Sequence, residues 1–212
     1  MVKTAVLVSG GGTNLQAILD AKAAGKLPHA EISLVVASRP DAYALVRAEK
    51  AGIPCAVLRK GKEKPIEQYG RELMELLHSH GIELVVLAGF LTILPENVIQ
   101  AYPKRILNIH PSLIPSFCGA GFYGLKVHEA ALAKGVKVTG ATVHFVNEIP
   151  DGGEIIAQKA VEVLPGDTPE VLQKRVMEHF MGQSFRTLGT SVQRNQEGKE
   201  KDESCPQYRC LL

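Results

Sequence analysis

The chain lacks tryptophan, has only 5% aromatic residues, and contains four cysteines that form no C-x-x-C pair. The wide spacing of these cysteines indicates neither a zinc site nor a disulfide framework. No run of about 18 apolar residues occurs, and the first apolar run is too short for a signal peptide. The net charge of +2 neither favours nor excludes a nucleic-acid surface. The simplest interpretation is a single-domain protein of a reducing cytoplasm.

Strands and helices alternate along most of the chain. Residues 84–88 are continuously apolar, which is typical of a parallel strand covered on both faces. Residues 138–146 and 154–163 alternate between polar and apolar and are joined by a Pro-Asp-Gly-Gly turn, which predicts a hairpin. The sequence therefore predicts an α/β fold: a Rossmann-like, mostly parallel sheet flanked by helices, with an antiparallel hairpin toward one edge. The other predicted strands are residues 4–9, 31–38, 55–58 and 106–109, and the other predicted helices begin at residues 13, 42, 65 and 126.

The last part of the chain changes in character. Residues 169–180 begin as an amphipathic helix, with Asp167 or Thr168 as its N-cap. Residues after 194 are polar, mixed in charge and poor in aromatics, a composition that does not form a core. We expect a domain over residues 1–185 and a disordered tail over residues 186–212.

Three glycines at positions 10–12 separate the first strand from the first helix. Such a turn brings backbone amides and a helix N-terminus close to an anion, so it can hold a phosphate. No Gly-Lys-[Ser/Thr] follows, and Leu15 stands where a dinucleotide-binding loop has its third glycine. The loop alone is equally consistent with a tight turn.

The loop at residues 89–95 and the turn that carries Asp151 can each be explained either by function or by structure alone. Residues 89–95 follow the fourth strand, where open α/β sheets bind ligands, and are apolar enough to line a pocket for a flat aromatic group. Phe90 and Leu94 could equally belong to the core. Asp151 lies in the Pro-Asp-Gly-Gly turn, and turn aspartates usually cap their own backbone.

Asn108 and His110 lie two residues apart at the end of the fifth strand and so point to the same side. Imidazole exchanges protons at physiological pH, and an amide can donate to a developing oxyanion. As an isolated pair they could also be a satisfied polar strand end. The other histidines are interpreted as structural, and His144, on an apolar strand, is a candidate for burial. No His, Cys and carboxylate set has metal-ligand spacing, so we expect no metal.

Four motifs occur together and in a fixed order: residues 9–18, residues 87–94, residues 108–115, and residues 142–146 followed by Asp151-Gly152-Gly153. In these motifs the chain resembles the phosphoribosylglycinamide formyltransferase family of folate-dependent formyltransferases. The resemblance extends from Val2 to about Val176.

The resemblance implies formyl transfer from 10-formyltetrahydrofolate to the amine of glycinamide ribonucleotide in purine biosynthesis. Asn108 and His110 would stabilise the oxyanion, and Asp151 would orient His110 and help move the amine proton. The other implied contacts are Gly12, Thr13 and Asn14 with the phosphate, Gly89 and Pro111 with the glycinamide arm, and Phe90, Leu91, Thr92, Ile93, Leu94, Ile106, Asn108 and Val146 with the folate. The implied partners are these small molecules, not nucleic acid or membrane, and the expected state is a monomer or weak homodimer.

The chain departs from the family in two places. An arginine that binds phosphate in some members has no clear counterpart, although Lys62 or Lys64 could replace it. The resemblance also ends abruptly after Val176, as a shifted reading frame would cause. The alternative function is therefore a folate- or nucleotide-binding protein with impaired catalysis. A nicotinamide-dependent reductase, suggested by the glycine loop and Arg39, is weakened by the missing third glycine. Length argues against the methionyl-tRNA formyltransferases and the formylfolate hydrolases of the same superfamily, which carry additional domains.

Overall fold

The fold is that of a computed structural model, which describes residues 1–178. Its strands are β1 Val2–Val8, β2 Ala30–Ala37, β3 Cys55–Val57, β4 Leu84–Leu87, β5 Ile106–His110, β6 Val138–Phe145 and β7 Ile155–Glu162. Its helices are α1 Thr13–Ala23, α2 Tyr43–Lys50, α3 Ile66–Ser79, α4 Glu96–Ala101 and α5 Leu125–Lys134. Residues 169–178 form a further helical segment.

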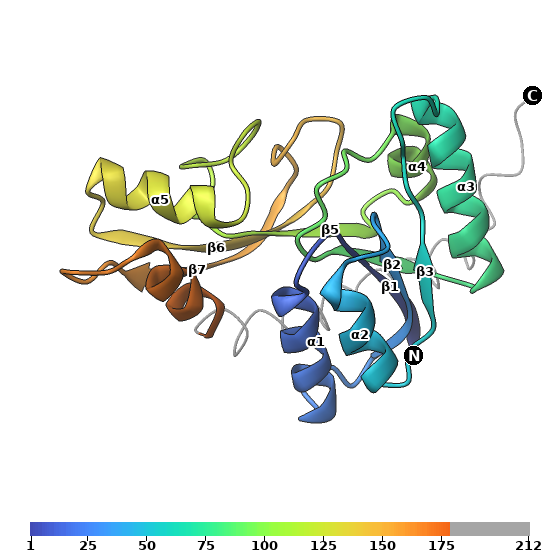
Figure 1. The fold of residues 1–212 in the computed structure, drawn as a ribbon, viewed down its shortest axis with the longest axis horizontal. Helices are drawn as coiled ribbons and strands as arrows, with labels where there is room; N and C mark the ends of the chain where they lie inside the picture. The colour runs from blue at the N-terminus through green and yellow to red at the C-terminus, as the bar shows by residue number, and fades with distance from the viewer. Residues whose placement is uncertain (179–212) are drawn as a thin grey trace, which may run out of the picture.

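All seven strands belong to one sheet in the order β3-β2-β1-β4-β5-β6-β7 (Figure 1). The first five in this order pair in parallel, whereas β6 pairs antiparallel with β5 and β7 antiparallel with β6. The predicted α/β fold with a hairpin at one edge is therefore confirmed. The strand order reverses direction between β1 and β4, and their carboxyl ends meet at the edge where ligands bind in open α/β sheets.

Two clusters of buried side chains cover the two faces of the parallel part of the sheet. Val6 and Val8 of β1 pack with α1, α2 and the helical segment 169–178. Ala5 and Leu7 of the same strand pack with α3 and α4 on the other face. This alternation explains why β1 and β4 are apolar throughout rather than at every second position.

Helix α4 was not expected from the sequence, because its six residues are too short to show helical periodicity. Its local signal is Pro95 at the N-cap followed by Glu96 in the first turn. At the later helix the Thr168 hydroxyl accepts a hydrogen bond from the Val171 amide at 3.4 Å, as an N-cap does. The predicted disordered tail, residues 186–212, and the proposed frame change lie largely or wholly outside the described residues.

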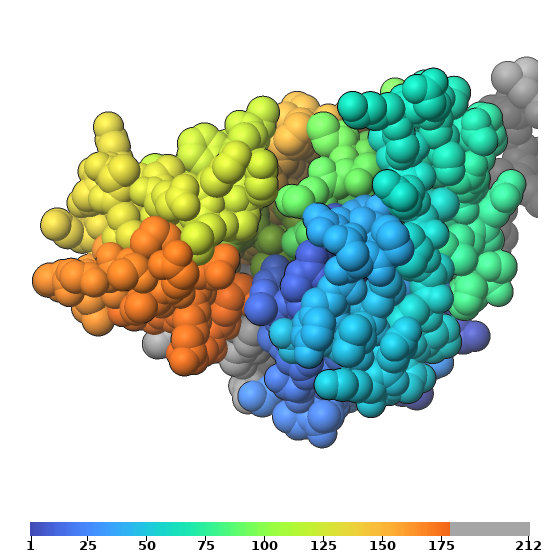
Figure 2. Space-filling view, viewed as in Figure 1, coloured from blue at the N-terminus to red at the C-terminus, as the bar shows by residue number. Residues whose placement is uncertain are grey.

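The space-filling view shows a hollow between the N-terminal residues and the part of the chain that includes the hairpin and α5 (Figure 2). Residues from the middle of the sequence, drawn in green, lie at its floor. Within residues 1–178, no helix is long and apolar enough to cross a membrane.

Candidate active site

Asn108 and His110 do lie on one side of β5, as the strand period requires. The Asn108 amide nitrogen Nδ2 is 3.1 Å from Oδ1 of Asp151 and donates a hydrogen bond to it. His110 Nδ1 is 3.4 Å from the other carboxylate oxygen of Asp151. The fold therefore brings together three residues that the sequence separates by up to 43 positions.

The turn that carries Asp151 is fixed by steric requirements. Asp151 itself has a positive φ of 55°, a left-handed conformation that aspartate tolerates better than most residues. A Cβ atom on Gly152 would lie 2.6 Å from the Ile149 side chain, and one on Gly153 would lie 1.7 Å from the Phe145 carbonyl oxygen. Both glycines are therefore needed for the turn to fold back onto β6 and aim the carboxylate at β5.

The Asp151 carboxylate is held in its charged form. Burial on its own raises its pKa, but the contact with His144, the hydrogen bond that the Gly119 amide donates at 2.9 Å, and the nearby His110 imidazole together lower the pKa below its usual range. With a side chain only 12% exposed, this carboxylate is a largely desolvated negative charge next to two imidazoles.

His144 also belongs to this cluster, although the sequence alone indicates only a structural role for it. The antiparallel register of β5 and β6 pairs Asn108 directly with His144. His144 Nε2 lies 3.1 Å from Asn108 Nδ2 and 3.4 Å from Asp151 Oδ1. Its position on an alternating strand opposite Asn108 was a usable signal, but only once the hairpin register was known.

The hydrogen-bond partners indicate different roles for the two imidazoles. His144 Nδ1 is 2.7 Å from the Phe145 carbonyl, so it carries the proton and leaves Nε2 to accept from Asn108. His110 faces acceptors on both sides, because its Nε2 is 2.8 Å from the Phe117 carbonyl and its Nδ1 faces Asp151. The hydrogen bond to the Phe117 carbonyl requires a proton on Nε2, so in a neutral imidazole Nδ1 would face the carboxylate without one.

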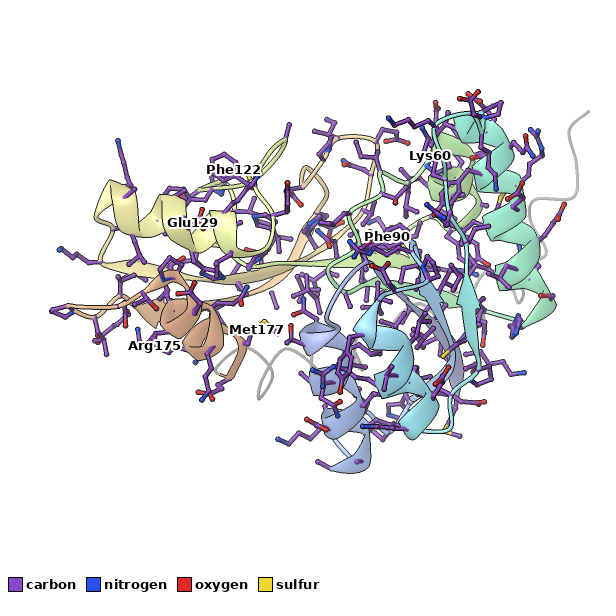
Figure 3. All side chains as sticks on the ribbon, in the orientation of Figure 1. Lys60, Phe90, Phe122, Glu129, Arg175 and Met177 are labelled. Atoms are coloured by element: carbon purple, nitrogen blue, oxygen red, sulfur yellow. The ribbon has the colours of Figure 1, made fainter. Side chains whose placement is uncertain are left out.

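A pocket of about 140 Å³ opens beside this cluster. Its polar lining includes Asn108, His144 and Asp151 of this cluster. Six residues expected to bind the folate also line the pocket: the apolar Phe90, Leu91, Ile93, Leu94 and Val146, and the polar Thr92. Figure 3 shows the labelled Phe90 in the middle of the molecule. The pocket therefore joins an apolar slot to the polar cluster.

Ile106 is not among the residues that line this pocket; it is 1% exposed and packs in the core with α3 and α4. Its carbonyl accepts a hydrogen bond from the Val146 amide, so it supports the pocket wall from behind. The turn residues 147–150 also line the pocket, and no pattern in the sequence singled them out.

The glycine loop leaves β1 next to the loop that carries Phe90. The Ser9 hydroxyl accepts a hydrogen bond from the Leu91 amide at 2.9 Å, which ties the two loops together. Gly12 is the left-handed N-cap of α1, and no side chain caps that helix. The amides of Thr13 and Asn14 in the first turn are thus available for an anion.

The remaining expected residues are partly accessible. Gly89 is exposed with a φ of 72°, and Pro111 is half-buried directly after His110. Lys64 forms an ion pair with Glu72 of α3, so its charge is already compensated. Lys62 forms no ion pair or hydrogen bond with another residue in the described part of the chain. Within residues 1–178, no group of three His, Cys, Asp or Glu side chains is arranged to hold a metal ion.

Comparison with known proteins agrees with this geometry. A family model described as formyl transferase matches residues 2–183. The chloroplastic phosphoribosylglycinamide formyltransferase of Arabidopsis thaliana is 45% identical over 82% of the chain and 60% of its own length. The phosphoribosylglycinamide formyltransferase of Haemophilus influenzae is 44% identical over 84% of the chain and 81% of its own length.

A solved structure supports the same relationship. The glycinamide ribonucleotide transformylase 1 of Symbiobacterium toebii superimposes with a TM-score of 0.83 at 40% identity, covering 92% of this chain and 89% of its own. The chain thus spans about three-fifths of the plant relative and most of the bacterial ones. With this family match and a polar cluster at the carboxyl end of β5, the chain belongs to the formyl transferase family.

Proposed function

We propose that the protein transfers the formyl group of 10-formyltetrahydrofolate to the amine of glycinamide ribonucleotide. The observation that carries this proposal is the cluster of Asn108, His110, His144 and Asp151 beside an apolar pocket. The names of the relatives support the choice of substrates. No observation favours the alternative of a binding protein with impaired catalysis.

In the first step the substrate amine attacks the formyl carbon, and the carbonyl oxygen becomes an oxyanion. Asn108 Nδ2 carries two hydrogens, which point to Asp151 and His144, and one of these bonds must be exchanged for a bond to the oxyanion. A protonated His110 would contribute positive charge at the same end of β5, because its Nδ1 faces the Asp151 carboxylate. Together they stabilise the charge that develops in the transition state.

In the second step the bond between the formyl carbon and N10 of the folate breaks. The amine must lose a proton and N10 must gain one, so the proton count balances within the pair of substrates. Asp151 is the carboxylate of this cluster and carries the proton in this proposal, directly or through a water molecule; its lowered pKa keeps it deprotonated, and as a weak base it passes the proton on to N10. Its contacts with His110 and His144 hold it in position.

The two substrates occupy different parts of the site in this proposal. The folate ring lies in the apolar slot lined by Phe90, Ile93 and Val146, with Ile106 supporting the wall. The phosphate lies at the glycine loop, on Gly12, Thr13 and Asn14, and the glycinamide arm passes Gly89 and Pro111. The hydrogen bond from the Leu91 amide to the Ser9 hydroxyl holds the glycine loop and the folate-binding loop in a fixed relative position. A monomer or weak homodimer in the cytoplasm stays a prediction of the sequence.

The direct test is a spectrophotometric assay of the folate product with the full chain, run with and without glycinamide ribonucleotide. Product that appears only in the presence of the ribonucleotide supports the transferase. Product formed equally without it would indicate a hydrolase instead. A folate binding isotherm without turnover would replace the proposal by the binding protein.

A further inference from the structure

Arg47 of α2 holds the glycine loop although it lies 36 residues away in sequence. Its Nε donates a hydrogen bond to the Gly11 carbonyl at 2.8 Å. Its Nη1 donates to the Gln16 side chain of α1 at 3.0 Å. One guanidinium therefore bridges the loop and the helix that follows it, in the planar two-pronged geometry that lysine cannot reproduce.

The loop is packed closely against α2 on this side. The Ala44 amide donates to the Gly10 carbonyl at 3.1 Å. A Cβ atom on Gly12 would lie 2.7 Å from Ala44 and 3.3 Å from Cδ of Arg47. By contrast, a Cβ atom on Gly10 or Gly11 would meet nothing within 4 Å. The carbonyls of the loop thus turn toward α2, and its other side is open.

The Arg47 side chain is itself held in place. Its guanidinium carbon lies 5.1 Å from the centre of the Tyr43 ring, a cation–π distance. Tyr43 is the first residue of α2, so the ring, the guanidinium and the Ala44 amide all belong to one helical turn. This turn acts as a rigid support for the loop.

We propose that Arg47 is a positioning residue for the phosphate of the substrate: it fixes the Gly11 carbonyl toward α2 so that the amides of residues 12–14 face the phosphate. The inference rests on the proposed function of the site. Arg47 need not touch the phosphate, because its Nε and Nη1 are already engaged within the protein. Without it the loop samples other conformations and must be ordered when the phosphate binds, which weakens binding.

The test compares Arg47→Met, Arg47→Lys and the control Arg71→Met in the full chain. Methionine retains the apolar stem beside Gly12 but removes both hydrogen bonds. Arg71 is an exposed residue of α3, whose core contacts lie on the opposite face of the sheet from α2. We expect Arg47→Met to raise KM for glycinamide ribonucleotide roughly tenfold, as the loss of a charged hydrogen bond does, while kcat and KM for the folate change less than about twofold. Arg47→Lys should fall between Met and wild type.

A second measurement separates this inference from the proposed function. Calorimetric titration with ribose 5-phosphate needs no turnover, and its Kd should rise by a similar factor in Arg47→Met but not in Arg71→Met. If wild type does not use glycinamide ribonucleotide yet shows this difference, the proposed function fails and the role of Arg47 stands. An unchanged KM and Kd, a fall in kcat alone, or an equal loss in Arg71→Met would each overturn the role of Arg47. Should Arg47→Met not fold, the same comparison is made with Arg47→Lys.

Discussion

Asp151→Asn tests the centre of the proposed mechanism, because it removes a charge while preserving the shape of the side chain. The carboxylate lies 3.4 Å from His110 Nδ1 and 3.4 Å from His144 Nε2. A carboxylate and a protonated His110 at this separation attract by about 5 kcal/mol at an effective dielectric constant of ~20, whereas His144 is neutral. Part of this is offset by the burial of a side chain that is only 12% exposed.

We therefore expect a loss of about 3–5 kcal/mol of transition-state stabilisation, which corresponds to a fall in kcat of roughly 10²–10⁴-fold. The amide that replaces the carboxylate would also place hydrogens where Asn108 Nδ2 now donates, so the hydrogen-bond network of the cluster would be disturbed as well. KM for the ribonucleotide should change little, because Asp151 does not lie in the glycine loop.

The assay is steady-state turnover at saturating concentrations of both substrates, measured from pH 5 to pH 9. The lowered pKa keeps Asp151 ionised throughout this range, since an ordinary aspartate titrates near 4. Asp151 therefore does not titrate between pH 5 and pH 9, and the ratio of the wild-type kcat to the Asp151→Asn kcat should stay constant over this range. Asp167→Asn is the matched control: Asp167 forms an ion pair with Arg175 at 2.6 Å, so its loss should lower Tm and leave kcat nearly unchanged. A kcat for Asp151→Asn within tenfold of wild type would refute the assigned role.

Two stability predictions follow from other residues. Burial and the nearby charge of His110 lower the pKa of His128 to about 4, so below pH 6.5 the unfolded chain binds a proton that the folded chain does not, and stability falls as the pH drops from 6.5 to 4. In urea unfolding, His128→Phe should reduce the change in the free energy of unfolding between pH 6.5 and pH 4 by up to about 3 kcal/mol. His29→Phe, a change at an exposed histidine, should leave this change as in wild type. The same pH dependence in wild type and both variants would contradict the lowered pKa of His128. Gly153→Ala should cost about 3 kcal/mol because its Cβ would lie 1.7 Å from the Phe145 carbonyl oxygen, while Gly10→Ala, with open space around its Cβ, should not lower the unfolding midpoint comparably.

The sequence was sufficient to predict the order and type of most elements, because each depends on a local pattern. The apolar strands, the glycine loop and the Pro-Asp-Gly-Gly turn all lie within a few residues of the signals that define them. Helix α4 was missed because its six residues leave too short a window for periodicity. Local patterns therefore predicted the scaffold well and its shortest helix poorly.

The composition of the site depended on long-range pairing, which local patterns do not contain. Asn108 and His110 could be placed on one face because they belong to one strand. His144 could not be joined to them, since its contact with Asn108 depends on the register of an antiparallel pair 36 residues apart. Ile106 lies on the same strand, but its side chain packs in the core and does not line the pocket, so its contact with the folate stays a prediction.

The position of Asp151 links the fold to the chemistry most directly. A carboxylate between two histidines is costly to bury, so the backbone must hold it there. The antiparallel hairpin provides this: β6 returns beside β5, and the turn after it is forced back by Gly152 and Gly153, which leave no room for side chains. Because β6 runs antiparallel to β5, its last residue, Phe145, pairs with Leu107, and the turn that follows folds back alongside Asn108 instead of leaving beyond the carboxyl end of β5. The switch from parallel to antiparallel pairing at β5 is thus what brings the acid to Asn108 and His110.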